Sequence, residues 1–253
     1  MASYFIYDSI NMYRSDNTVT EGTITTGTFS ASNSLTNHER SSDQNIGTVI
    51  TGVNDNDAIE YAVGSSVTAD AAAVYFTGDD GVASGTIMTF YIDTDRTSLP
   101  SKGTLSAVSS SGWAVASLTE TTGTNFFTEF NASVSNVAEI LIGKKLTFEI
   151  EPDVNIQTTK DYATEVQRSL GGVEYAINVN PGQEVITISF QNISSTFKND
   201  LITMQDALKG EGKKFLYYDN SSFHWVRLDK TITFTEIADG RFSTQLTLRQ
   251  QLQ

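Results

Sequence analysis

Short apolar runs separated by turn-forming residues extend over most of the chain, a pattern typical of antiparallel β structure. In the first half, this pattern predicts strands at 23–29, 58–63, 71–76, 85–92, 113–118, 124–130, 137–142 and 145–150. Roughly eight strands is the number found in a jelly roll. We therefore expect this half of the chain to be a β-sandwich without a long helix.

A different period marks the segment 194–209. Its apolar residues recur every three or four positions, which places them on one stripe of an amphipathic helix. The predicted helix core consists of Phe197, Leu201, Met204 and Leu208. Ser195 or Thr196 is expected to cap the first turn, and Gly210 with Gly212 is expected to end the helix.

Strands are predicted on both sides of this helix. Residues 184–193 alternate between apolar and polar, and hairpins are predicted over 165–177, 213–228 and 231–248. The second half is therefore expected to be an α+β module in which one helix packs on an antiparallel sheet.

The apolar alternation lapses between 151 and 161, where we expect the boundary between two domains. This divides the chain into an N-terminal arm or edge strand over 1–20, a jelly-roll domain over 21–152 and an α+β module over 160–253.

The charge of the chain narrows its possible partners. Thirty acidic and 16 basic residues give a net charge of −14, which argues against binding a nucleic-acid backbone or an anionic membrane surface. The chain contains no cysteine, so neither disulfides nor thiolate metal sites are possible. No apolar run approaches the ~20 residues of a membrane span, and no signal-peptide core is recognisable. We expect a soluble chain made without an export signal.

Some apolar and aromatic residues fall outside the predicted cores. The predicted interface residues are Tyr4, Phe5, Tyr7, Tyr13, Ile202 and Arg227. The four N-terminal aromatics follow no clear period, yet they are costly to leave in water, so we expect another subunit or a neighbouring protein to cover them. Ile202 lies off the helix stripe, and Arg227 follows closely after Trp225.

The residues give no sign of an enzyme. No nucleophile elbow, phosphate loop, dinucleotide glycine motif or zinc-protease motif occurs. His38 and His224 are the two histidines, and they fall in different predicted domains, so a histidine-based catalytic or zinc site is not expected. We predict no catalytic residue, no metal site and no cofactor.

Two weaker patterns have a structural and a functional interpretation. Acidic clusters at 54–57, 79–80 and 93–95 offer oxygen ligands of the kind that calcium prefers, but none completes a calcium loop, and turn formation is the preferred interpretation. The aromatic cluster of the second half comprises Tyr217, Tyr218, Phe223 and Trp225. It is interpreted as core rather than as a platform for a sugar.

Several stretches together resemble a known kind of protein. In the first half these are SASNSLTNHERSS (30–42), IEYAVGSSVTADAAAVYFTG (59–78) and VAEILIGKKL (137–146). They are similar to discoidin-like, galactose-binding-like jelly rolls attached to tail proteins of tailed bacteriophages. In the second half these are RSLGGVEYAINV (168–179), EVITISFQNISSTFKNDLITMQDAL (184–208), KKFLYYD (213–219) and WVRL (225–228). They resemble the partner module of the same proteins and, more loosely, distal-tail or baseplate-hub proteins.

The resemblance covers most of 21–250 and implies a function in assembly. It implies a non-enzymatic virion protein of the tail tip, baseplate or distal tail, made in the host cytoplasm. Its partners would be copies of itself in a ring and neighbouring tail proteins. The alternative is a carbohydrate-binding module that recognises host glycans through its loops, above all 30–45. The chain lacks the cysteine pair of extracellular discoidin domains.

Overall fold

Strands dominate both halves of the chain, which confirms the predicted fold class. The computed structural model describes residues 2–8, 18–25, 27–31, 35, 37–43, 45–51, 53–77, 85–93, 96, 98–106, 111–134, 137–152, 157–161, 164–169, 174–178 and 182–251. The chain divides into a sandwich unit, Ile6–Lys145, and a C-terminal unit formed by Met1–Phe5 with Leu146–Gln253. The division therefore precedes the segment 151–161 in which the sequence predicted it.

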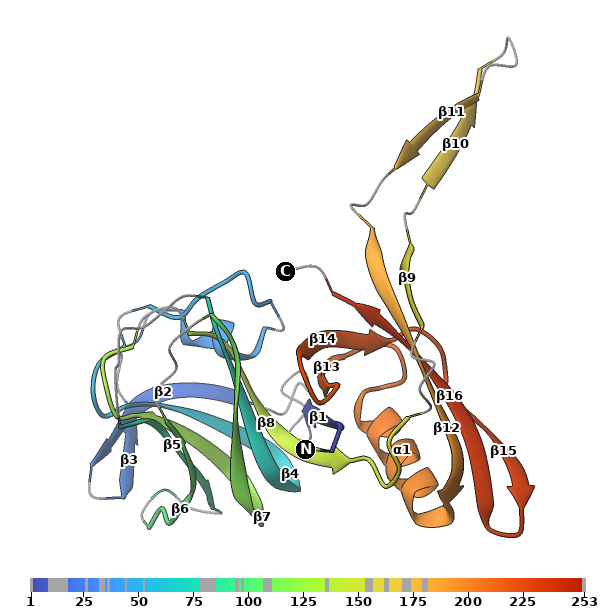
Figure 1. Ribbon diagram of the computed structural model, residues 1–253. Helices are drawn as coiled ribbons and strands as arrows, with labels where there is room; N and C mark the ends of the chain where they lie inside the picture. The colour runs from blue at the N-terminus through green and yellow to red at the C-terminus, as the bar shows by residue number, and fades with distance from the viewer. Residues whose placement is uncertain are drawn as a thin grey trace. The chain divides into compact units, whose positions relative to one another are not determined.

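The sandwich unit is an antiparallel β-sandwich (Figure 1). Its strands are β2 (Thr18–Thr25), β3 (Thr28–Ala31), β4 (Asp57–Phe76), β5 (Thr86–Asp93), β6 (Ser101–Ser106), β7 (Gly112–Phe130) and β8 (Val137–Thr147), with a short 3-10 helix at His38–Ser42. They follow the order β6-β5-β7-β4-β8, while β2 pairs with β4 and β3 pairs with β2. Strand β1 (Tyr4–Asp8) contains the boundary between the two units.

Two long strands pass through both layers of the sandwich. Strand β4 pairs with β7 over most of its length, with register shifts between Ala62 and Val67 and between Ala69 and Ala71. Its first part pairs with β2 and its last part pairs with β8. The apolar core includes Ile59, Tyr61, Val74, Phe76, Phe90, Phe126, Phe130 and Ile142.

The sequence divided both of these strands in two, and this was wrong. It placed a turn between 63 and 71 and an interruption between 118 and 124, where the polar and small residues belong to continuous strands. Register shifts bend a strand without ending it. A bend and a turn interrupt apolar alternation in the same way, so the pattern alone cannot separate them.

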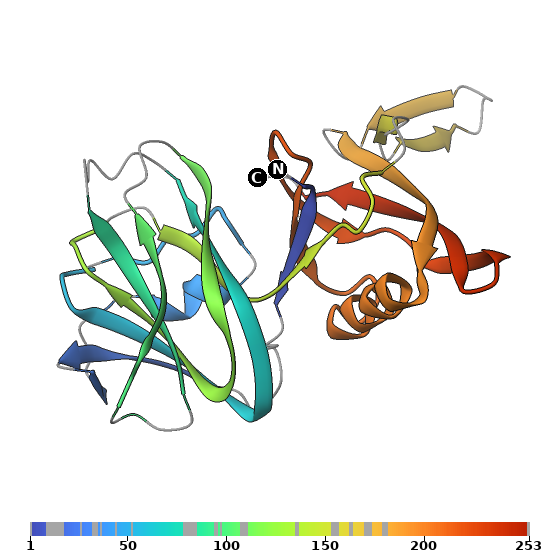
Figure 2. The same cartoon turned by 60° about the horizontal axis from the view of Figure 1, so that its bottom comes forward.

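The C-terminal unit is an antiparallel sheet with one helix across it, as Figure 2 shows. Its strands are β9 (Gln157–Asp161), β12 (Gln183–Ser194), β13 (Lys214–Tyr218), β14 (Phe223–Leu228), β15 (Thr233–Ala238) and β16 (Arg241–Gln250). The order is β13-β14-β16-β12-β9, with β15 also on β16. Strands β10 (Thr164–Arg168) and β11 (Glu174–Asn178) form a separate two-stranded sheet.

Helix α1 (Ser195–Ala207) buries its apolar stripe against β12 and β16. Phe197, Leu201, Met204 and Leu208 are 3%, 0%, 0% and 0% exposed. The cap is Ser194 rather than Ser195 or Thr196, because the Ser194 hydroxyl accepts a hydrogen bond from the Phe197 amide at 3.1 Å. Gly210, with φ of 66°, takes the left-handed conformation expected after a helix end. Ile202 lies off the stripe and is 38% exposed.

The first residues are core, not an arm. The Phe5 side chain is 0% exposed, and its ring centroid lies 4.7 Å from that of Phe148 and 5.3 Å from that of Phe215. Tyr4 is 7% exposed and its ring lies 4.9 Å from that of Tyr218. Their own unit therefore covers both side chains, and they cannot make the predicted subunit contacts.

Two further residues of the predicted N-terminal interface differ in their placement. Tyr7 is buried as well, at 7% exposed, so it does not offer a surface to a neighbour. Tyr13 lies outside the described residues. A strand covered on both faces shows no apolar alternation, which explains why this segment did not look like a core element.

Within the described ranges, no helix is both long enough and apolar enough to span a membrane.

Candidate functional site

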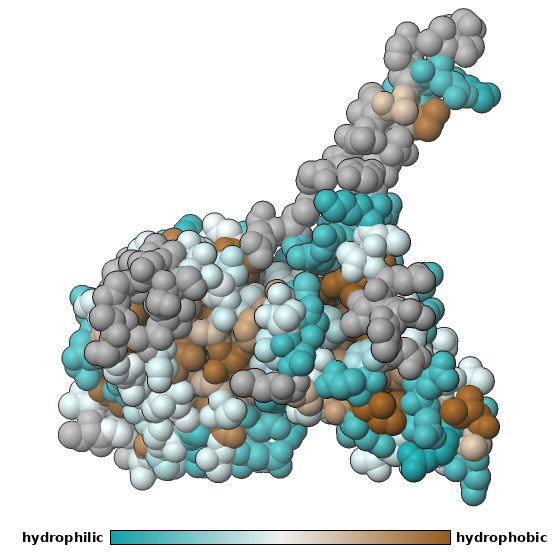
Figure 3. All heavy atoms as spheres, in the orientation of Figure 1, coloured by the Kyte–Doolittle hydropathy of each residue, from teal (hydrophilic) through white to brown (hydrophobic). Residues whose placement is uncertain are grey.

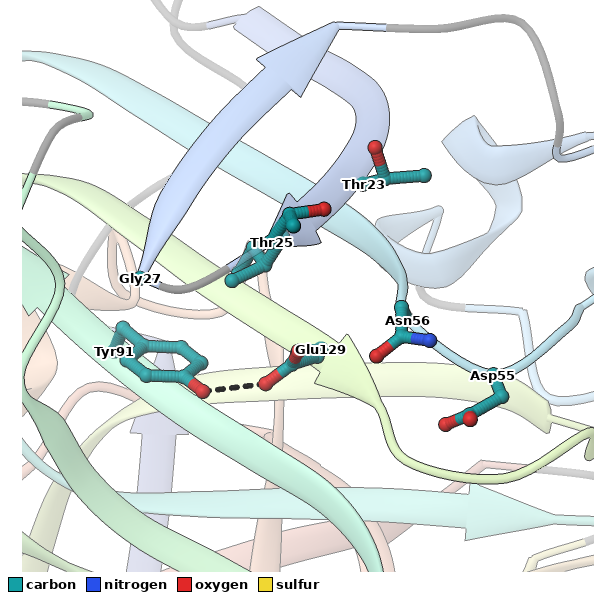
Figure 4. Close-up of a pocket in the computed structure, with 8 residues that line it drawn as sticks. Thr23, Thr25, Gly27, Asp55, Asn56, Tyr91 and Glu129 are labelled. Carbon is teal, nitrogen blue, oxygen red and sulfur yellow. Dashed lines mark hydrogen bonds between the residues drawn. The ribbon is translucent and has the colours of Figure 1, made fainter.

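A polar pocket of about 580 Å³ opens on the sandwich unit, beside the turn between β2 and β3. It is lined by Thr23, Ile24, Thr25, Gly27, Asp55, Asn56, Tyr91 and Glu129 (Figure 4). Its volume falls within the range of about 300–1,000 Å³ that is usual for small-molecule sites. The pocket is therefore large enough to be considered as a ligand site.

Strand alternation brings Tyr91 and Glu129 to the same face. On β7, Phe126 and Phe130 face the sandwich core, so Glu129 faces the opposite side. On β5, Phe90 and Ile92 belong to the core, and Tyr91 faces the opposite side likewise. Glu129 pairs in register with Thr89, two residues before Tyr91, which gives the diagonal spacing within reach of long side chains.

The two side chains are joined by a hydrogen bond. The Tyr91 hydroxyl donates to Glu129 Oε2, as the dashed line in Figure 4 marks. Burial raises the pKa of Tyr91, and the hydrogen bond to Glu129 and its negative charge raise this pKa further. The phenol therefore stays protonated at neutral pH and acts as a hydrogen-bond donor.

One carboxylate oxygen of Glu129 accepts no hydrogen bond from the described residues. The side chain is only 7% exposed, and no donor among the described residues reaches its Oε1 atom. This atom is not among the fully buried polar atoms that lack a partner, so it keeps some accessible surface, and Glu129 lines the pocket. A nearly buried carboxylate normally has several hydrogen bonds, which makes this oxygen the most distinctive feature of the pocket.

The turn before β4 forms a second wall. Asn56 has φ of 69°, its amide donates to the Phe130 carbonyl at 2.7 Å, and its carbonyl accepts from the Ile24 amide at 3.1 Å. The Asp57 carboxylate closes the same turn by accepting from the Asn54 amide at 2.7 Å. The backbone is thus fixed, and the exposed side chains of Asn56 and its neighbour Asp55 remain for a ligand.

An ion pair between the exposed Arg96 and the buried Glu60 supports the wall around Gly27. Arg96 donates from Nε to Glu60 Oε1 at 2.7 Å and from Nη2 to Glu60 Oε2 at 2.5 Å, and Asn125 donates to Glu60 Oε1 at 2.7 Å. The Glu60 side chain is 0% exposed. The segment that follows Arg96 then holds the β2–β3 turn, because the Leu99 amide donates to the Gly27 carbonyl at 3.0 Å.

The loop 30–45, which the carbohydrate alternative singled out, contributes no described residue to the pocket. Its described residues are used within the fold instead. The Leu35 amide donates to Glu21 Oε2 at 3.0 Å, and Ser41 accepts from the Tyr61 hydroxyl at 2.8 Å. The described residues of this loop and the pocket are therefore separate candidates.

The described residues of the predicted acidic clusters do not come together as a metal site. Within the ranges that the structure describes, no three His, Asp or Glu side chains are placed to hold one metal ion. In the cluster 54–57, Asp57 stabilises a turn, which was the preferred interpretation. Asp93 is described, whereas 79–80 and Asp95 lie outside the described residues.

The other candidates lie in different places. Tyr217 and Trp225 are 1% and 2% exposed, so they belong to the core and not to a sugar platform. His38 lies 3.5 Å from a carboxylate oxygen of Glu21 in the sandwich unit, and His224 lies 2.9 Å from Asp219 in the C-terminal unit. Arg227 is partly buried, with its Nη2 atom 3.9 Å from an Asp229 carboxylate oxygen.

Sequence reasoning missed Tyr91 and Glu129. Both fall in segments that the pattern predicted as strands, 85–92 and 124–130, and both were counted as ordinary strand residues. A signal was present, since Tyr91 lies directly between the core residues Phe90 and Ile92, and Glu129 directly precedes the core residue Phe130. The pairing of β5 with β7 was needed to see that the two meet.

Comparison with known proteins gives matches among solved structures alone. No protein-family pattern and no curated protein matches the chain. The CBM32 of AlyQ in complex with 4,5-unsaturated mannuronic acid is 17% identical, with 57% of this chain and 98% of that chain covered and a TM-score of 0.39. CpGH89CBM32-5 from Clostridium perfringens, in complex with GalNAc-β-1,3-galactose, is 11% identical, with 53% and 99% covered and a TM-score of 0.40.

A third solved structure contains a further domain. Truncated AlyQ with its CBM32 and alginate lyase domains is 14% identical, with 88% of this chain and 56% of that chain covered and a TM-score of 0.40. None of these three is a phage tail protein. Likeness of this degree assigns neither a ligand nor an activity to the chain.

Proposed function

We propose that this chain is a non-catalytic binding protein and that the sandwich unit holds a carbohydrate in the pocket beside Tyr91 and Glu129. The observation that carries the proposal is the accessible, unpaired Oε1 atom of a nearly buried glutamate. Carbohydrates present many hydroxyl groups, each of which can donate to such an oxygen. The side-chain amide of Asn56 and the hydroxyl of Thr23 add further donors and acceptors at the same pocket.

The state of Tyr91 favours binding over turnover. Its pKa is raised, so its hydroxyl remains a donor to Glu129 and is a poor nucleophile. The same bond leaves Glu129 in one fixed orientation. Pockets that select a ligand hold their few polar groups rigidly in this way, because a preformed site costs little ordering on binding.

Titration calorimetry of the full chain against a panel of oligosaccharides tests the proposal. Saturable binding is expected, and Glu129→Gln and Tyr91→Ala are expected to weaken it by about tenfold or more, since each removes part of the polar contact. Tyr218→Ala is the matched control, because Tyr218 is a partly exposed tyrosine of the other unit. Absence of binding across the panel, or equal affinity in the Tyr91→Ala variant, contradicts the proposal.

A different observation favours contact with another protein, which the second candidate, an assembly subunit of a phage tail, requires. Among the described strands, β10 and β11 pair with each other and with no other strand, and Val166 on β10 is 60% exposed. Ile237 on the edge strand β15 is 53% exposed. Figure 3 shows apolar surface on the β10–β11 hairpin and near β15. An isolated two-stranded hairpin is marginally stable in water, so a partner that covers it would stabilise it.

In this second candidate, copies of the chain form a ring in the virion tail and contact neighbouring tail proteins. The test is incorporation of Val166→Asp into the parent particle, compared with Gln167→Asp, which places the same charge on the adjacent exposed residue. Reduced incorporation of Val166→Asp alone supports assembly through the hairpin. Equal incorporation of both variants, or a particle that lacks the chain, counts against it.

A further inference from the structure

We infer that the pocket beside Tyr91 and Glu129 selects amino sugars, which carry a protonated amine, and rejects uronic acids. This inference rests on the proposed function and names the class of carbohydrate that the pocket takes. Three features of the pocket carry it: the charges of its lining, the unpaired oxygen of Glu129 and the lack of a cationic donor.

The described lining residues carry negative charge only. Asp55 and Glu129 are the carboxylates among them, and none of them is a lysine, arginine or histidine. Asp57 in the same turn adds a third carboxylate nearby, although Asn54 already donates to it. The whole chain has a net charge of −14, so no distant excess of positive charge opposes this local field.

Arg96, which supports the wall around Gly27, already holds another carboxylate. Arg96 uses Nε and Nη2 to hold the buried carboxylate of Glu60, and its guanidinium lies 5.6 Å from the centre of the Phe29 ring. Moving it to an anionic sugar would leave Glu60 buried with a single donor, which is strongly unfavourable. A uronate carboxylate would therefore meet neutral donors and two like charges.

The free oxygen of Glu129 fits a cationic donor. Tyr91 donates to Oε2, which leaves Oε1 to accept from the ligand. The side chain is 7% exposed, so a hydrogen bond from an ammonium group forms where water screens charge poorly. Any donor to this carboxylate makes a charge-assisted hydrogen bond, but only an ammonium donor adds attraction between opposite charges. An amine is thus preferred over the acetamide or hydroxyl of an otherwise identical sugar.

Calorimetry with three oligosaccharides of equal length tests this preference. The probes are fully deacetylated glucosamine, N-acetylglucosamine and galacturonic acid oligomers, titrated into the full chain at low salt and mildly acidic pH. We expect the deacetylated oligomer to bind about tenfold or more tightly than the acetylated one. The uronate should show no saturable binding. The preference should shrink as salt is added, because salt screens the charges.

Variants separate the pocket from the overall charge of the chain. Glu129→Gln and Asp55→Asn should each reduce the preference for the deacetylated oligomer. Glu211→Gln, an exposed residue of the C-terminal unit, changes the net charge equally and should leave the preference intact. Because Glu129 is nearly buried, thermal melts accompany its variant, and the exposed Asp55 keeps the test decisive if that variant unfolds.

The outcomes distinguish this inference from the proposed function. If no oligosaccharide in this set or the wider panel binds, the proposed function itself fails. If the uronate binds as tightly as the amino sugar, the pocket binds carbohydrate and the inference is overturned. If the preference survives in both Glu129→Gln and Asp55→Asn, net charge alone explains it, and the inference is again overturned.

Discussion

Phe5→Ala should destabilise the C-terminal unit although the residue lies at the other end of the sequence. Its fully buried ring lies 4.7 Å from the Phe148 ring, 5.3 Å from Phe215 and 5.4 Å from Tyr217. Truncating a buried phenylalanine to alanine costs about 3–5 kcal/mol, which combines lost burial with the cavity that remains. Loss of three aromatic contacts places the expected cost in the upper part of that range.

The two tryptophans allow each unit to be followed separately. Trp113 lies on β7 of the sandwich unit and Trp225 lies on β14 of the C-terminal unit. In a Trp113→Phe background, emission reports the C-terminal unit, and in a Trp225→Phe background it reports the sandwich unit. Urea denaturation in each background gives the unfolding midpoint of the unit that the remaining tryptophan reports. At a slope of about 1–3 kcal/mol per molar urea, Phe5→Ala should lower the Trp225 midpoint by roughly 2 M.

Phe29→Ala is the matched control for this experiment. Phe29 is 5% exposed and packs against Phe127 in the sandwich unit, so the same truncation should lower the Trp113 midpoint instead. The assignment of the N-terminal residues to the C-terminal core is refuted if Phe5→Ala leaves the Trp225 midpoint unchanged. A shift of the Trp113 midpoint alone would refute it as well.

Three further variants test the packing and the charges of the fold. Arg96→Ala leaves the buried Glu60 carboxylate with one donor and should lower the stability of the sandwich unit by about 2 kcal/mol. The cost is less than for a fully buried pair because Arg96 is 50% exposed, and an unchanged midpoint in Trp113 fluorescence contradicts this prediction. Burial raises the pKa of Asp219, but the hydrogen bonds of its turn outweigh that effect and lower it to about 2 from 3.8. Its stabilisation of about 2 kcal/mol is therefore present above pH 3.8 and lost as the pH falls toward 2, so Asp219→Asn should flatten the acid part of the Trp225 stability curve. Leu201 is 0% exposed, so Leu201→Ala should lower the free energy of unfolding by about 2–5 kcal/mol in urea denaturation. Ile202 is 38% exposed, so Ile202→Ala should lower it by less than about 1 kcal/mol, and equal costs would contradict the helix stripe.

Local patterns determined much of the fold. The helix, the strand before it and the hairpins at 165–177, 213–228 and 231–248 were all predictable, because each rests on short-range alternation and turn residues. The predicted helix stripe is the one that the structure buries. The helix cap was missed by one residue, since several neighbouring hydroxyl residues satisfied the same rule and only the geometry selects Ser194.

Long-range pairing determined the rest. The N-terminal aromatics looked unpartnered because their partners, such as Phe148 and Phe215, are far away in sequence. The pocket was missed for the same reason, since Tyr91 and Glu129 are 38 residues apart and meet only through the pairing of two strands. The sequence suggested loop 30–45 for sugar binding because it is polar and long, whereas the pocket is built from strand residues and two tight turns.

Two glutamates of the sandwich unit show why Glu129, in particular, is the residue to test. Glu60 and Glu129 are 0% and 7% exposed, and they lie on β4 and β7, which pair with each other. Glu60 has its charge matched by Arg96 and a further bond from Asn125, as a carboxylate retained for stability should. Glu129 has one bond from a neutral hydroxyl and keeps an oxygen directed to a cavity. Of these two, Glu129 is therefore the one at which we expect a ligand to supply a donor.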